Sequence, residues 1–185
     1  ANLGVILAEM GYRVLMLDLD PQADLTRQFG VAETQIGMDA LLSFKDDARD
    51  VILPLSEQLS LIASGPELHL FEQQTPSIKL GVKLKQLLTS TIQSDADIIL
   101  IDCAAISGLL GTNAVLAASD MLIPVSAEHG ALRGMIKMLP VLQRVAKLRS
   151  DSIRLWLCLN RLPDGTDFAY QFGDLLTQYF PKRVL

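Results

Sequence analysis

Residues 13–22 read Arg-Val-Leu-Met-Leu-Asp-Leu-Asp-Pro-Gln, and the fold is best deduced from this stretch. Val14 to Leu17 form an apolar run that ends abruptly in two carboxylates, Asp18 and Asp20, and a proline. An uninterrupted apolar run is typical of a parallel strand that is covered on both faces. Side chains at the carboxyl ends of such strands project into the crevice that binds ligands in open α/β sheets. Residues 13–20 therefore predict a buried strand whose end carries functional acids.

A second strand of the same kind is predicted at residues 97–102, Asp-Ile-Ile-Leu-Ile-Asp, where four apolar residues again lead to an acid, Asp102. Shorter apolar runs predict further strands at 51–55, 59–63, 121–125 and 153–159. Helical spacing of apolar residues predicts helices at 2–10, 36–44, 77–92, 108–118, 131–148 and 167–179. Strands that alternate with helices predict an α/β fold: a doubly wound, mostly parallel sheet in three layers, α/β/α, as a single domain over residues 1–185.

Composition limits the classes of function. The chain has 185 residues, of which 50% are hydrophobic, and a formal net charge of -5. The acidic balance argues against a constitutive binder of polyanions, although a local basic patch remains compatible with it. Apolar runs are too short for a transmembrane helix, so the apolar residues are expected in a buried sheet. Cys103 and Cys158 lack the spacing of metal or redox sites and are predicted to be buried thiols in a reducing compartment.

The three acids at the strand ends, Asp18, Asp20 and Asp102, are predicted to converge. Carboxylates that converge repel one another unless a divalent cation or a protonated partner offsets their charge. Magnesium with a nucleotide is the usual solution. The alternative interpretation is that Asp18 and Asp20 only cap loops and helices, and the Asp-x-Asp-Pro-Gln pattern together with Asp102 gives it less weight.

The run Val-Leu-Met-Leu-Asp-Leu-Asp-Pro-Gln-Ala-Asp-Leu-Thr over residues 14–26 resembles the motif after the phosphate loop in ParA/Soj partition ATPases. These belong to the deviant Walker A branch of the P-loop NTPases (SIMIBI type), with MinD and the nitrogenase iron protein. Residues 97–103 resemble the family's Walker B strand, and residues 108–114 resemble the helix that follows it. Residues 122–134 resemble the next strand and helix entry, whereas the resemblance is weak between residues 32 and 94.

The resemblance implies a role for each matching residue. Asp20 would be the catalytic acid that positions the attacking water, and Asp102 would hold magnesium through a water molecule. Asp18 would help to organise the site around the metal and would contact the same magnesium through a water molecule. Asp24 lies in the first switch region and would sense the γ-phosphate. The residues implied to bind the cofactor ATP are Asp18, Asp24, Asn160 and Arg161, of which Asn160 would hydrogen-bond adenine.

The resemblance also implies partners: an ATP-dependent homodimer, non-specific DNA and a ParB-like centromere-binding protein, in the cytoplasm at the nucleoid and without a membrane. A basic set could contribute to a DNA-facing surface, although a solvated helix face explains it equally well. This set consists of Arg144, Lys147, Arg149, Arg154, Lys182 and Arg183.

Two departures from the family pattern keep alternatives open. The phosphate loop, Gly-Gly-x-Gly-x-Lys-Thr, is absent from residues 1–185, and the family's layout implies that it lies just upstream of Ala1. The first helix pattern also begins without a cap. The final Val184-Leu185 is equally abrupt, so both ends are expected to be truncated. After Asp102, Cys103-Ala104-Ala105 replaces the usual Pro-Pro pair.

Other functions remain possible at this stage. A non-catalytic, nucleotide-gated scaffold or regulator would bind ATP with little turnover. A MinD-like positioning ATPase would need a C-terminal amphipathic membrane helix, and none is visible. An iron–sulfur reductase is disfavoured, because the two cysteines do not show the arrangement of cluster ligands.

Overall fold

The computed structural model describes residues 1–43, 48–92, 96–103, 108–126, 138, 140, 142–145, 147–149, 151–160, 173–174, 176–178, 180 and 182–185. The chain forms two compact units, Ala1–Ala117 and Ala118–Leu185. None of the helices in these described ranges is both long and apolar enough to cross a membrane.

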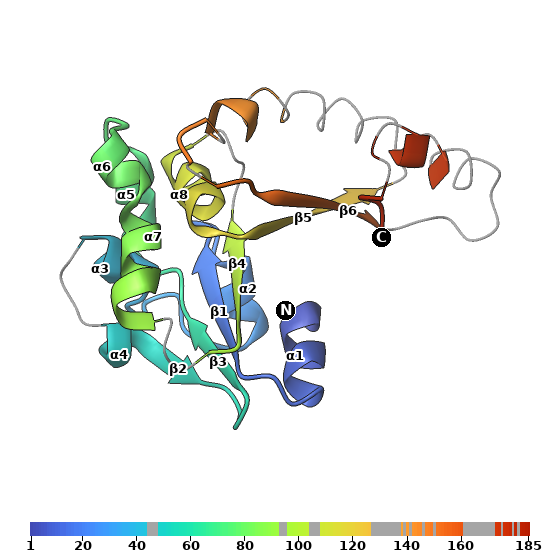
Figure 1. Ribbon diagram of the computed structural model, residues 1–185. Coiled ribbons are helices and arrows are strands. Elements are labelled where there is room, and N and C mark those ends of the chain that lie inside the picture. The colour runs from blue at the N-terminus through green and yellow to red at the C-terminus, as the bar shows by residue number, and fades with distance from the viewer. Residues whose placement is uncertain are drawn as a thin grey trace. The chain divides into compact units, whose positions relative to one another are not determined.

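The first unit is built on a four-stranded sheet with the order β2-β3-β1-β4 (Figure 1). Strand β1 (Val14–Leu19) lies between β3 (Leu59–Ile62) and β4 (Ile98–Cys103), and it is parallel to both. The edge strand β2 (Ile52–Pro54) pairs with β3 in the antiparallel direction. All six residues of β1 are buried, as an uninterrupted apolar run predicts for a central strand.

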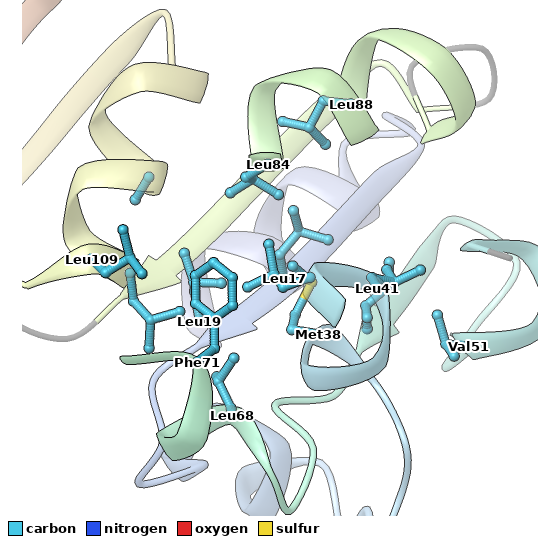
Figure 2. Packing of buried hydrophobic residues seen from close by; sticks show 14 of the residues in the cluster. Leu17, Leu19, Met38, Leu41, Val51, Leu68, Phe71, Leu84, Leu88 and Leu109 are labelled. Atoms are coloured by element: carbon cyan, nitrogen blue, oxygen red, sulfur yellow. The ribbon is translucent and has the colours of Figure 1, made fainter. Parts of the chain in front are cut away.

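Successive β1 side chains point to opposite faces of the sheet, and each face has its own apolar core. Leu15, Leu17 and Leu19 pack in one cluster with buried residues that come mainly from four helices. Figure 2 shows this cluster around Leu17, Leu19 and Phe71. The helices are α3 (Met38–Ser43), α5 (Leu68–Glu72), α7 (Lys83–Leu87) and α8 (Leu109–Ala117).

The other face of β1 carries Val14 and Met16. They cluster with apolar residues of α1 (Asn2–Glu9) and α2 (Asp24–Gln28), and with others that follow α2. Helices therefore cover both faces of the sheet, which confirms the predicted three-layer α/β/α arrangement for this unit. The first helix ends as predicted, because Gly11 has a φ of +92°, a conformation that favours glycine.

The prediction of a single helix over residues 77–92 is wrong in one respect, because the structure divides this range into separate helical segments. Ser77 caps α6 (Ile78–Gly81), since its side chain accepts a hydrogen bond from the Leu80 amide. Helix α7 then begins anew at Lys83 and continues into one π-helical turn, η1 (Leu88–Ile92). The physical reason is Asn113 of α8, whose side-chain amide binds the Leu80 carbonyl and the Leu84 amide. These two groups would otherwise pair with each other in a continuous helix.

The position of Lys83 also differs from what the sequence indicates. Helical spacing predicts this side chain on the exposed side of its helix, yet the residue is 7% exposed. Its ammonium group donates a hydrogen bond to the Leu42 carbonyl at the end of α3, and it lies 5.7 Å from the centre of the Phe71 ring. Desolvation by burial, together with the charge of Lys79, lowers the pKa of Lys83. The lysine therefore joins α7 to α3 and α5 inside the core.

The second unit contains two parallel strands, β5 (Asp120–Ser126) and β6 (Arg154–Asn160), which confirm the strands predicted there. Arg154 binds both carboxylate oxygens of Asp120 at 2.7 Å, and the Trp156 indole donates to Asp120 at 2.9 Å. The helices predicted over residues 131–148 and 167–179 lie largely outside the described residues. The short helix α4 (Ala48–Val51) in the first unit completes the described elements.

Candidate active site

The acids at the ends of β1 and β4 meet as predicted. The parallel register places Asp18 directly beside Asp102, and the next pair is Leu19 with Cys103. Asp20 follows β1 immediately. The carboxyl end of the sheet in the first unit therefore carries a cluster of three acids.

Asp18 is the innermost acid and has no exposed surface. Its Oδ2 accepts hydrogen bonds from the Thr26 amide at 2.8 Å and from the Thr26 hydroxyl at 2.6 Å. Its Oδ1 accepts from the Asp20 amide at 3.2 Å. Three of about four lone-pair positions of the carboxylate are thus occupied by the protein. Asp18 holds the start of α2 and the main chain after β1, in line with the alternative interpretation of this residue as a cap.

Asp20 is only partly buried, so its carboxylate remains accessible. Its Oδ1 accepts a hydrogen bond from the Gln22 amide at 2.8 Å, which orients the side chain over the turn that follows. The Asp20 carbonyl accepts from the Ser64 hydroxyl at 2.7 Å and from the Ala23 amide at 2.9 Å. Of the two acids at the carboxyl end of β1, Asp18 and Asp20, only Asp20 has a carboxylate that can meet a ligand.

Asp102 is exposed to solvent, and the neighbouring charges of Asp18 and Asp20 have the same sign as its own. Partial desolvation and then the charge of Asp18 raise the pKa of the Asp102 carboxyl, and Asp20 adds to the rise. A divalent cation would relieve this repulsion. Magnesium in nucleotide sites takes one or two carboxylates together with waters and phosphate oxygens, so the exposed Asp102 fits such a ligand set.

Cys103 occupies the first position of the Cys-Ala-Ala departure. Burial and the neighbouring charges of Asp102 and Asp20 raise the pKa of its thiol to about 11. The side chain therefore stays a neutral thiol at physiological pH and is a poor nucleophile. Ala104 and Ala105 lie outside the described residues.

The other predicted site residues belong to different parts of the chain. Asp24 begins α2 with an exposed side chain that forms an ion pair with Arg27. Asn160 ends β6 in the second unit and pairs with Ser126 of β5 in the strand register. Arg161 lies outside the described residues.

The basic set that could contribute to a DNA-facing surface or form a solvated helix face is less uniform than its sequence suggests. The Arg149 side chain is only 2% exposed, and it donates to the Ala118 carbonyl at 2.6 Å and pairs with Asp151. That expectation is wrong for Arg149, because local packing covers its side chain. Arg144 and Lys147 are exposed.

Sequence reasoning did not identify three residues that make polar contacts between elements of the first unit. Thr26 and Ser64 are buried and contact the Asp18 and Asp20 groups from α2 and from the end of β3. Glu72 of α5 accepts hydrogen bonds from the Leu109 and Leu110 amides at 3.1 and 2.7 Å and so caps α8. These contacts join residues far apart in the chain, so no local pattern indicates them.

Comparison with known proteins gives the family. A family profile described as an AAA domain matches residues 1–155. The sporulation initiation inhibitor protein Soj of Bacillus subtilis is 32% identical, with 99% of this chain and 74% of that protein aligned. The chromosome-partitioning ATPase Soj of Treponema pallidum is 31% identical, with 99% of this chain and 73% of that protein aligned.

A solved structure shows the same fold. The cobyrinic acid a,c-diamide synthase of Mycobacterium smegmatis with a bound ATP analogue and magnesium superimposes with a TM-score of 0.83 at 23% identity. The match covers 96% of this chain and 74% of that one. It confirms the mostly parallel α/β/α fold of the P-loop type. With the acids of β1 and β4 in register and these relatives aligned over almost the whole chain, the protein belongs to the ParA/Soj-type partition ATPase family.

Proposed function

We propose that this protein hydrolyses ATP with magnesium and uses the cycle to partition DNA, with residues 1–185 belonging to one ATPase domain. The observation that carries the proposal is the acid cluster: Asp18 and Asp102 stand side by side on β1 and β4, and the accessible Asp20 follows directly. Family membership supports the ATPase activity, and the solved relative with an ATP analogue and magnesium supports the choice of cofactors.

The three acids take different roles because their environments differ. Asp20, with an accessible and oriented carboxylate, positions the attacking water. Asp102 would hold magnesium through a water molecule, and the metal would supply charge neutralisation for the phosphates. The Asp18 carboxylate already accepts three hydrogen bonds from the protein, so Asp18 contributes to the metal site by organising the residues around it. Asp24 contributes to sensing the γ-phosphate, and Asn160 and Arg161 to holding adenine.

The remaining steps follow the family. ATP closes a homodimer, the dimer binds DNA without sequence preference, and a ParB-like centromere-binding protein stimulates hydrolysis and release in the cytoplasm. The named partitioning function of the Treponema relative supports this cycle. Exposed Arg144 and Lys147 are compatible with the DNA step.

Phosphate release from ATP by the full-length protein tests the proposal. We expect hydrolysis that DNA and the partner stimulate and that removal of magnesium with EDTA abolishes. Asp102→Asn should raise the magnesium concentration needed for half-maximal activity. Glu57→Gln is the matched control, because it removes an exposed acid from the loop before β3, at the amino ends of the parallel strands. Wild-type protein that releases no phosphate under any of these conditions would contradict the proposal.

One observation favours a second candidate, a nucleotide-gated scaffold with little turnover. Cys103-Ala104-Ala105 follows the Walker B acid where the family usually has a proline pair. This candidate predicts ATP-dependent dimerisation with negligible phosphate release even when DNA and the partner are present. The same assay, combined with light scattering to measure the mass of the complex, separates the two functions.

A further inference from the structure

Four hydrogen bonds close a ring around the proposed catalytic acid. The Asp20 amide donates to Asp18 Oδ1 at 3.2 Å, and Asp18 Oδ2 accepts from the Thr26 hydroxyl at 2.6 Å. Thr26 Oγ1 in turn accepts from the Ser64 amide at 3.1 Å. The Ser64 hydroxyl donates to the Asp20 carbonyl at 2.7 Å, which returns the ring to its start.

Burial makes this ring stiff. Asp18 and Ser64 are fully buried, and Thr26 is 1% exposed, whereas Asp20 alone is partly open to solvent. A buried polar group that loses its hydrogen-bond partner costs free energy, because water cannot reach it to replace the bond. The three buried residues of the ring therefore strongly prefer this one arrangement. The ring therefore holds the main chain of Asp20 at both its amide and its carbonyl.

The ring is also anchored to the rest of the unit. Ser64 lies two residues after β3, whose last residue, Ile62, is paired with Leu17 of β1. The Ser64 carbonyl accepts a hydrogen bond from the Asp39 amide at 3.1 Å, near the start of α3. Asp39 Oδ1 in addition accepts from the Gly37 amide at 2.9 Å. Strand β3 and helix α3 thus fix Ser64 independently of the turn that carries Asp20.

We infer that Thr26 and Ser64 are positioning residues for catalysis: they set the place of the Asp20 carboxylate by holding its main chain, without touching the nucleotide. This inference rests on the proposed hydrolysis of ATP. Misplacement of a catalytic group by a fraction of an ångström to 1 Å lowers the rate far more than it lowers substrate binding. Loss of a ring hydroxyl should therefore lower kcat and leave ATP affinity almost unchanged.

The test uses full-length protein and variants that each remove one hydroxyl. Ser64→Ala deletes the bond to the Asp20 carbonyl but keeps the Ser64 amide. Thr26→Val deletes the hydroxyl at nearly constant shape, and Thr26→Ser restores it. Ser43→Ala is the matched control, because its hydroxyl also donates to a carbonyl at 2.7 Å, that of Asp39, outside the ring.

We expect Ser64→Ala and Thr26→Val to lower kcat at least about tenfold. ATP affinity should stay within about threefold of wild type, and Thr26→Ser and Ser43→Ala should retain most of the activity. All rates are measured well below the melting temperature of each variant, so that a loss of stability does not pass for a loss of catalysis.

Two results would overturn the inference alone. One is an unchanged kcat in Ser64→Ala and Thr26→Val while the wild type is active, which leaves the proposed function standing. The other is a loss in Thr26→Val that Thr26→Ser does not restore, because the hydroxyl would then not be the cause. A wild type that does not hydrolyse ATP contradicts the proposed function itself, and the role of the ring in catalysis is overturned with it.

Discussion

Replacement of Asn113 by leucine should destabilise the protein strongly, although leucine has a similar size. Asn113 is fully buried in α8. Its Oδ1 accepts from the Leu84 amide at 3.0 Å, and its Nδ2 donates at 2.9 Å to the carbonyls of Leu80 and Leu109. One side chain therefore bridges α6, α7 and α8 at the break between the first two. Leucine fills the space but makes none of these bonds.

The magnitude follows from the groups left without partners. The Leu84 amide is a buried donor, and an unsatisfied buried donor costs about 1–3 kcal/mol. The Leu80 carbonyl is only part-buried at this contact, so water can replace some of its loss and the cost there is about 1 kcal/mol. We therefore expect the free energy of unfolding to fall by about 2–4 kcal/mol.

Urea denaturation followed by circular dichroism measures this change. Thr112→Val is the matched control, since its hydroxyl donates to the carbonyl of Gly108, the residue before α8, at 2.9 Å. The free energy of unfolding of the control should fall by about 1 kcal/mol or less. A leucine variant no less stable than the control would refute the reasoning, because it would mean that Leu84 pairs with Leu80 and the helix closes without cost.

Two further predictions concern stability. Gly37→Ala should cost about 3 kcal/mol or more, because an added Cβ would lie 2.0 Å from the Ala63 carbonyl oxygen, whereas Gly11→Ala meets open space and should cost only about 1–2 kcal/mol for its positive φ. Equal losses of unfolding free energy would contradict this reading. Arg13 donates to Asp97 and lowers the pKa of that carboxyl to about 2 from 3.8, so the ionised pair stabilises the fold above about pH 4 and stops doing so as pH falls toward 2. The Tm difference between wild type and Asp97→Asn should shrink over that window, and a difference that does not change with pH would speak against it.

The sheet could be predicted from the sequence because its signal is local. The runs 14–17 and 98–101 are apolar without interruption and each leads to an acid, so both the buried strands and the edge with the acids follow from a few neighbouring residues. Even the position of Asp18 beside Asp102 follows once the strands are taken as parallel neighbours in register.

The contacts that organise the site could not be predicted in this way. Ser64 and Thr26 are 38 positions apart, and Asn113 and Leu84 are 29 positions apart. Helical periodicity places Lys83 with the polar residues, but a carbonyl and an aromatic ring provide partners for it inside the core. Periodicity reports which face of an element is apolar, and it carries no information about a polar side chain that finds its partner on another element.

The most direct test of the central claim is ATP hydrolysis by full-length Asp20→Ala beside wild type, with ATP binding measured on the same samples. The account predicts that the variant binds ATP with nearly unchanged affinity and that its turnover falls by about 100-fold or more, since the group that positions the attacking water is gone. Turnover equal to that of wild type would contradict the role assigned to Asp20.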